Sequence, residues 1–168
     1  MNYNIACNIL NLKPQIIKKA IFNSCKIKKG IVEKDEKERN LRKTLNFGHT
    51  FAHAFEATLN YSKKLNHGEA VILGMNTALN FSLKKKLINK SDFSLITNHI
   101  SKNKLPNKIN KFFSVKDINK IISFMNNDKK NKSDKINLIL LKKIGSPIIN
   151  QQFSKKNIIS FLRGELRN

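Results

Sequence analysis

Hydrophobic residues recur at helical spacing along most of the chain. A helix has about 3.6 residues per turn, so apolar positions three or four apart share one face. Pro14 stands early in the first such segment, where a helix tolerates the missing N–H. Ser114, with Asp117 three residues later, is a plausible helix cap. The spacing predicts helices over 13–26, 49–60, 67–86, 91–103, 114–128 and 154–163.

Residues 135–149 have a different pattern. They are rich in Ile and Leu and are interrupted by Gly145 and Pro147, which predicts two short strands around a turn. The chain contains no internal repeat and no long linker, and 168 residues suit one domain. The pattern therefore predicts a single, mainly α domain over residues 1–168, with a small β-hairpin near the C-terminus.

The sequence pattern predicts neither a membrane segment nor a leader. There is no apolar run of about 18 residues, and the N-terminus lacks a basic start followed by an apolar stretch. Cys7 and Cys25 do not have the spacing of a metal site. Two thiols in such a chain are most simply free, so we expect a cytoplasmic protein with no membrane contact.

The net charge of +22 is the most unusual feature of the composition. It favours either a basic helical nucleic-acid-binding module or compositional drift, because Lys, Asn and Ile, whose codons are AT-rich, are abundant throughout. The lysines are not interleaved with stacking aromatic residues, and arginine is scarce for a surface that reads bases. We therefore favour drift, and nucleic acid is not an expected partner. An anionic substrate would still be attracted by this charge.

Histidines gather in one part of the chain. His49 and His53 lie one helical turn apart, on a different stripe from Phe51 and Phe55, and His67 follows shortly after. Two histidines at this spacing can chelate zinc. The glutamate of a metalloprotease motif is missing, however, and the pair alone is more often two ordinary histidines. The addition of His67 strengthens the case for a site.

Two glutamates near these histidines each allow more than one interpretation. Glu56 either orients His53 through a hydrogen bond or is an exposed helix residue. Glu69 is expected to complement the dipole at the start of its helix rather than to bind metal. Asp35, Glu36 and Glu38 are expected to be surface charges or local salt partners of nearby arginines.

The order of these residues is more specific than the histidines alone. The segment "DEKERNLRKTLNFGHTFAHAFE", followed by "HGEAVILGM", resembles the C-terminal domain of 3-dehydroquinate synthase. The resemblance extends to "NNDKKNKSDKINLILLKKIG" and so covers most of the chain. Ala52 replaces a glycine that is usual in the family, but a small residue is kept. The matching residues are Asp35, Glu36, Glu38, Arg42, Leu45, Asn46, Gly48, His49, Thr50, His53, Ala54, Glu56, His67, Gly68, Glu69, Ala70, Val71, Gly74 and Met75.

The resemblance implies a role for particular residues. It implies that His49 and His67 are ligands of a divalent metal, zinc or cobalt, and that the catalytic His53 faces the substrate. The residues that it implies for substrate binding are Lys28, Arg42, Asn46 and one of Lys129 and Lys130. Arginine and lysine suit a substrate that carries a phosphate and a carboxylate.

The resemblance also implies an activity. Family enzymes are phosphate–oxygen lyases that convert 3-deoxy-D-arabino-heptulosonate 7-phosphate to 3-dehydroquinate and phosphate, in the shikimate pathway to chorismate and the aromatic amino acids. They use NAD catalytically and bind it mainly through an N-terminal domain. The resemblance also implies a glutamate as the third metal ligand, some tens of residues before the position of Met1. A related sugar-phosphate cyclase with the same histidine layout remains an alternative.

The family's NAD-binding domain has no counterpart in this sequence, which contains six glycines and no glycine-rich nucleotide-binding segment. We therefore expect an N-terminally incomplete C-terminal domain. Three interpretations stay open: a fragment of a normal synthase, one half of a split enzyme, or an inactive remnant. The first two together are favoured, and they imply a homodimer or assembly with a separate NAD-binding half.

Overall fold

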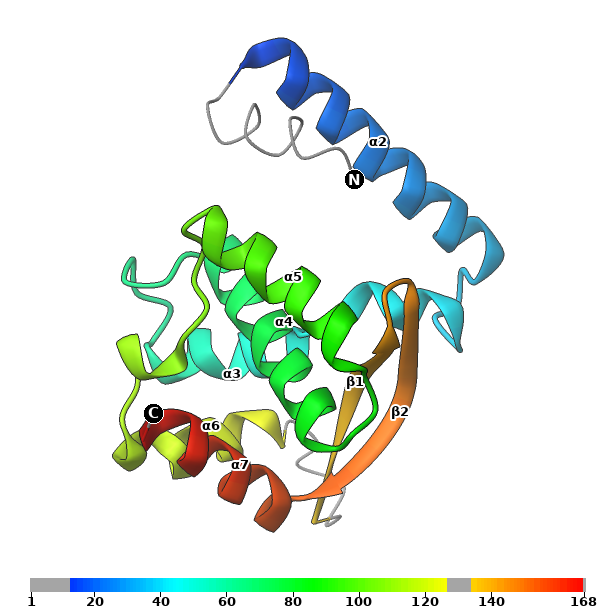
Figure 1. Ribbon diagram of the computed structural model, residues 1–168. Helices are drawn as coiled ribbons and strands as arrows, with labels where there is room; N and C mark the ends of the chain where they lie inside the picture. Colours follow the sequence, from blue (N-terminus) through cyan, green and yellow to red (C-terminus); the bar gives the residue numbers. More distant parts are fainter. Residues whose placement is uncertain (1–12, 127–133, 168) are drawn as a thin grey trace. The chain divides into compact units, whose positions relative to one another are not determined.

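The structure is a computed structural model that describes residues 13–126 and 134–167 (Figure 1). It divides into two compact units, Met1–Leu45 and Asn46–Asn168. The described residues are mainly helical, with one antiparallel hairpin near the C-terminus, which confirms the predicted fold class. The expectation of one domain over 1–168 stays a prediction. None of the described helices is long and apolar enough to cross a membrane.

The first unit contains a long helix, α2 (Pro14–Lys34), and most of a short 3₁₀ segment, η1 (Leu41–Asn46). Pro14 occupies the first turn, as predicted. Proline lacks a backbone N–H, and this costs nothing there because an N–H in the first turn of a helix has no acceptor within the helix. The helix runs eight residues beyond the predicted end at residue 26, because the apolar stripe continues through the half-buried Ile31 and Val32. It ends at Asp35, whose N–H donates to the Ile31 and Val32 carbonyls at 3.1 Å.

The core of the second unit is built on two neighbouring helices, α3 (His49–Thr58) and α4 (His67–Lys84). The predicted stripe of α3 is confirmed, because the Phe51 and Phe55 side chains are completely buried. The remaining helical segments around this pair are α5 (Lys90–Lys102), η2 (Ile109–Lys111), η3 (Val115–Asp117), α6 (Ile118–Met125) and α7 (Lys155–Arg167).

The helix predicted over 114–128 is shorter and begins with a 3₁₀ turn. The cap is confirmed: the Asp117 carboxylate accepts hydrogen bonds from the Ser114 N–H at 2.8 Å and from its hydroxyl at 2.9 Å. This arrangement satisfies a backbone donor that has no partner within the helix. α6 ends at Met125, so the prediction that the helix includes residue 126 is wrong. Residues 127 and 128, which the prediction also included, lie outside the described residues.

The hairpin pairs β1 (Lys135–Lys143) with β2 (Ser146–Ser154) in antiparallel register. Its turn contains Gly145 at φ +76°, a conformation that glycine adopts without a side-chain clash. The Ser82 hydroxyl on α4 accepts a hydrogen bond from the Leu141 N–H at 3.1 Å, which ties β1 to the helix pair. The strand residues buried in the core are Ile136, Leu138, Leu140 and Leu141.

Helices α3 and α4 touch backbone to backbone near the start of α3. Gly48 has φ +83°, and a Cβ added to it would lie 2.5 Å from the Met75 backbone nitrogen. A Cβ added to Gly74 would collide with the carbonyl oxygen of Gly48 and would lie 2.8 Å from the Ala52 backbone nitrogen. Only glycine fits at both positions, and the contact fixes how closely the two helices approach.

We predict opposite effects for alanine at two helical glycines. Gly74→Ala should lower the free energy of unfolding by about 1–3 kcal/mol, because backbone atoms block the new methyl group. Gly164→Ala in α7, where an added Cβ would meet no atom within 4 Å, should raise it by about 0.5–1 kcal/mol through helix propensity. Urea denaturation of both variants measures this difference. Equal stabilisation by the two would contradict the close contact.

Candidate metal centre

Three imidazole rings come together where α3 and α4 meet. His49 and His53 lie one turn apart on α3, and His67 is the first residue of α4. The ring centroids of His49 and His53 are 5.4 Å apart, and each lies 6.5 Å from the centroid of His67. Residues from two segments of the sequence therefore form one cluster.

A carboxylate on α3 holds the His67 ring. The Oε1 atom of Glu56 lies 3.0 Å from Nδ1 of His67. The Glu56 side chain is 11% exposed, whereas that of His67 is 66% exposed. Both interpretations of Glu56 from the sequence are wrong: it is not an exposed helix residue, and its hydrogen bond goes to His67, not His53. The packing of α4 against α3 brings the His67 ring within its reach.

His49 has the opposite environment. Its Nδ1 atom is buried and has no hydrogen-bond partner in the described part of the chain. A buried polar atom without a partner costs about 1–3 kcal/mol. A metal ion, a water molecule or a hydrogen-bonding group that bound this nitrogen would remove that cost.

Two of these imidazoles have the properties of metal ligands, but they do not complete a site. In a metal-binding histidine, the ring nitrogen that does not bind the metal usually forms a hydrogen bond with a carboxylate. Nδ1 of His67 forms such a bond with Glu56. Within 13–126 and 134–167, no group of three His, Cys, Asp or Glu side chains is arranged to hold a metal ion. Zinc takes four ligands, so the residues present fit part of a zinc site.

Glu69 is occupied elsewhere. Its Oε2 atom accepts a hydrogen bond from the Asn66 N–H at 2.9 Å and forms part of a capping box at the start of α4. The expectation that Glu69 serves the N-terminus of its helix is confirmed. The cap also fixes the backbone at His67, because it closes the first turn of the helix in which that residue lies.

The predicted substrate residues are distributed over both units. Lys28 is exposed on α2, and Arg42 belongs to the same unit, where its guanidinium donates to the Glu36 carbonyl at 2.7 Å. Asn46 is exposed and ends η1 in the second unit. Lys129 and Lys130 lie outside the described residues. The roles of these residues, and of the three histidines, stay predictions.

The comparison with known protein families decides the assignment of this chain. The model of the family described as "3-dehydroquinate synthase C-terminal" matches residues 3–131, which is more than half of the sequence. The chain belongs to this family.

Relatives of known name agree with the family. The 3-dehydroquinate synthase of Pelagibacter ubique (strain HTCC1062) is 61% identical over 158 residues, which are 94% of this chain and 43% of that protein. The synthase of Campylobacter concisus (strain 13826) is 39% identical over 156 residues, which are 92% of this chain and 43% of that protein. The chain therefore spans less than half the length of these curated relatives.

Solved structures place the fold among related cyclases. A 2-epi-5-epi-valiolone synthase from Streptomyces hygroscopicus subsp. jinggangensis, with NAD⁺ and Zn²⁺ bound, matches with a TM-score of 0.73 over 98% of this chain and 46% of that one. At 16% identity, this likeness shows the fold alone. A 2-deoxy-scyllo-inosose synthase complexed with carbaglucose-6-phosphate, NAD⁺ and Co²⁺ is 26% identical, with a TM-score of 0.60 over 77% of this chain and 35% of that one.

One family residue has a structural role that the sequence reasoning missed. The Asp35 carboxylate accepts hydrogen bonds from the backbone N–H groups of Arg39 at 2.9 Å, Asn40 at 2.8 Å and Arg42 at 3.0 Å. The expectation of a surface charge or side-chain salt partner overlooked these bonds to the backbone. An aspartate just after a long helix, followed by polar residues, is the available signal. Asp35 thus shapes the segment that carries Arg42.

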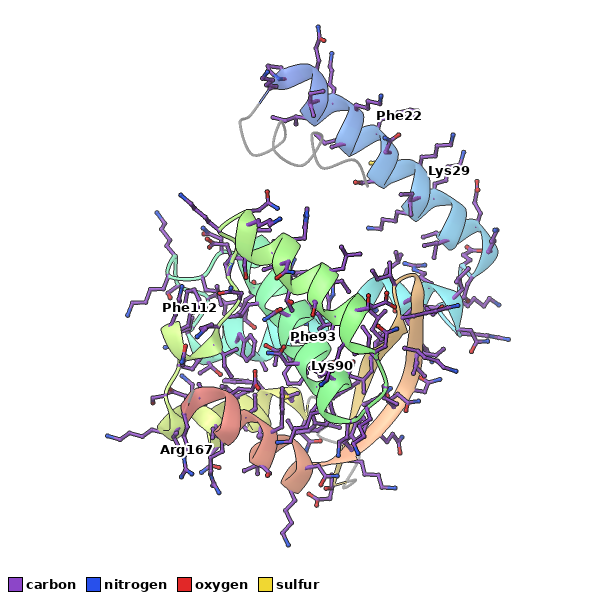
Figure 2. All side chains as sticks on the ribbon, in the orientation of Figure 1. Phe22, Lys29, Lys90, Phe93, Phe112 and Arg167 are labelled. Atoms are coloured by element: carbon purple, nitrogen blue, oxygen red, sulfur yellow. The ribbon has the colours of Figure 1, made fainter. Side chains whose placement is uncertain are left out.

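A cavity of about 240 Å³ lies apart from the predicted site residues. Its walls come mainly from α4, α5 and the segment that includes η2. Phe93, which Figure 2 labels, lies on α5 and is one of the lining residues. The Asn76 amide donates to the Asn107 carbonyl at 2.7 Å at this cavity. None of the predicted ligands or catalytic residues lines it, so the histidine cluster remains the candidate site of this family member.

We predict a low-pH transition in the segment that follows α2. The backbone N–H of Arg42 and then those of Asn40 and Arg39 hold the pKa of Asp35 below its ordinary value of 3.8. The stabilisation is therefore present above pH 3.8 and is lost as the pH falls through the lower, folded-state pKa. The backbone amide NMR signals of residues 39, 40 and 42 should titrate with a midpoint below 3.8 in the wild-type chain, and not in Asp35→Asn. A midpoint at or above 3.8 would contradict this account.

Proposed function

We propose that this chain is the metal- and substrate-binding part of a 3-dehydroquinate synthase. The proposed reaction converts 3-deoxy-D-arabino-heptulosonate 7-phosphate to 3-dehydroquinate and phosphate. The observation that carries the proposal is the cluster of His49, His53 and His67, built from two helices within a family-matched segment. The chain's identity to curated synthases over most of its own length supports it.

In this proposal, His49 and His67 would hold a divalent metal ion, zinc or cobalt. The buried Nδ1 of His49 and the Glu56 hydrogen bond to His67 support this assignment. The 26% identical 2-deoxy-scyllo-inosose synthase was solved with Co²⁺ and NAD⁺, which also supports it. When bound, the metal polarises hydroxyl groups of the substrate and stabilises negative charge that develops on them. Further ligands come from outside the described residues.

His53 has a different role in the proposal. It lies on the same face of α3 as His49 and is exposed, so its ring is accessible to a bound substrate. Imidazole exchanges protons near neutral pH, which suits a group that moves a proton to or from the substrate. Lys28, Arg42, Asn46 and one of Lys129 and Lys130 would bind the phosphate and carboxylate groups of that substrate.

The proposal includes a cofactor and a partner. NAD would be bound by an N-terminal nucleotide-binding half, either joined to this sequence or supplied by a separate chain, in a cytoplasmic and homodimeric enzyme. The net charge of +22 would attract the anionic substrate. A related sugar-phosphate cyclase is the second candidate, favoured by the structural likeness to 2-deoxy-scyllo-inosose synthase.

Phosphate release by the purified chain tests the proposed activity. The assay contains the heptulosonate phosphate, NAD and Zn²⁺, with or without a separately expressed NAD-binding half of the Pelagibacter relative. We expect release only when that half is present. Release by this chain alone would contradict the need for a second half, and no release in either case would favour an inactive remnant. Release only from a sugar phosphate without a carboxylate would favour the related cyclase.

We predict that the three clustered histidines separate into two classes. His49→Ala and His67→Ala should abolish zinc uptake by the assembled enzyme, because each removes a proposed ligand. His53→Gln should retain zinc and lower the turnover number by about 10²- to 10⁴-fold, the usual size of a lost proton-transfer group. His99→Ala on α5 is the matched control and should change neither quantity. Metal analysis after dialysis, together with the phosphate assay, measures both. Loss of zinc in His53→Gln would contradict the division.

A further inference from the structure

We propose that Glu56 is a positioning residue that sets the tautomer and ring orientation of His67. By accepting the hydrogen of Nδ1, it would leave the lone pair of Nε2 free to bind a metal ion. The consequence for metal binding rests on the proposed function, whereas the tautomer itself is a property of this chain without metal.

The two partners of this hydrogen bond differ in exposure and in their surroundings. Glu56 lies in the last turn and a half of α3, between the completely buried Phe55 and the buried Ala57, and its side chain is 11% exposed. Its helix is therefore anchored in the core on both sides of the carboxylate. The His67 side chain is 66% exposed and lies in the first turn of α4. The less exposed partner of the pair therefore restricts the more exposed one.

The hydrogen bond restricts an otherwise free ring. An exposed histidine can rotate about its side-chain torsions and can exchange its proton between the two ring nitrogens. A carboxylate has no proton to donate, so a neutral ring 3.0 Å from Oε1 must place its hydrogen on Nδ1. The same bond fixes the ring plane, because the hydrogen lies in that plane. Nε2 then has a defined direction before any metal arrives.

The neighbouring carboxylate on α4 has a different partner. Glu69 is two residues further along α4 and accepts a hydrogen bond from the Asn66 N–H at 2.9 Å. The His53 ring lies nearly parallel to that of His67, with an angle of 20° between the ring planes and 6.5 Å between the centroids. It faces one side of the His67 ring and does not determine which nitrogen of that ring carries the hydrogen. The tautomer of His67 therefore depends on Glu56 and not on its neighbours along α4.

The test compares three variants of the full 168-residue chain. Glu56→Ala removes the acceptor, and Glu56→Gln keeps the volume and one weaker acceptor. Glu69→Gln is the matched control, because glutamine also serves in a capping box. Long-range ¹H–¹⁵N NMR of the metal-free chain at a pH where His67 is neutral reports its tautomer. Each variant is also assembled with the NAD-binding half of the Pelagibacter relative, and titration of that assembly with Co²⁺, followed by visible absorption, reports metal affinity. Circular dichroism checks that each variant is folded.

We expect His67 to carry its proton on Nδ1 in the wild type and in Glu69→Gln. In Glu56→Ala the proton should shift towards Nε2, and the dissociation constant for Co²⁺ should rise by about 10- to 100-fold, the usual effect of losing such a partner. Glu56→Gln should give intermediate values for both. It is the more conservative variant and remains informative if Glu56→Ala does not fold.

The two readouts separate this proposal from the proposed function. An Nε2–H tautomer in the wild type, or an unchanged tautomer in folded Glu56→Ala and Glu56→Gln, would overturn the role of Glu56, whatever metal the chain binds. The expected tautomers without Co²⁺ binding in any variant would leave Glu56 as the partner of His67 and would count against the metal site. An equal loss of Co²⁺ affinity in Glu69→Gln would also overturn the role, because it would show a general effect of charge.

Discussion

The close backbone contact between α3 and α4 is the constraint on which the candidate site depends. Gly48 and Gly74 have no side chains, and each occupies space where a Cβ would meet backbone atoms of the other helix or its start. This contact lets the first turn of α3 lie against the middle of α4. His49 follows Gly48 directly, so the glycine that permits the contact also sets the position of a proposed ligand. A larger residue at either place would move one histidine-bearing helix relative to the other.

The rest of the second unit holds this pair of helices in place. Aromatic rings fill the space beneath α3, with centroids 5.0 Å apart for Phe55 and Phe113 and 6.4 Å apart for Phe51 and Phe161. The Lys120 ammonium on α6 donates to the Thr58 carbonyl at 2.8 Å and so satisfies one of the last carbonyls of α3. At the other helix, the Asn66–Glu69 cap fixes the turn that contains His67.

This support has a chemical consequence. A metal or a substrate is bound most effectively by side chains that are already in position, because less conformational entropy is lost on binding. His49 starts a helix whose Phe51 and Phe55 are completely buried, and the ring of His67 is held by the mostly covered carboxylate of Glu56. The two proposed ligands therefore differ in exposure but share a rigid foundation on α3.

Much of the site could be predicted from the sequence because helical spacing is local. The spacing of His49 and His53 fixes their shared face, and the buried Phe51 and Phe55 on the other stripe fix which side faces the core. The Ser114–Asp117 cap and the hairpin around Gly145 are also local patterns, and both are confirmed.

The interactions that could not be predicted depend on tertiary packing or on backbone donors. Glu56 forms a hydrogen bond with His67 because the start of α4 lies near the end of α3. Residue spacing within one helix contains no information about how a second helix packs against it. Asp35 binds three backbone N–H groups, which do not appear in a sequence as charged partners.

The central claim is that His49 and His67 bind one metal ion while His53 stays free for the substrate. X-ray absorption spectroscopy of the zinc-loaded enzyme, assembled with its NAD-binding half, tests this claim most directly. The account predicts scattering from two imidazoles per zinc, with Zn–N distances of about 2.0–2.1 Å, and the same two imidazoles in His53→Gln. A spectrum that requires three imidazoles, or one that loses an imidazole in His53→Gln, would contradict it.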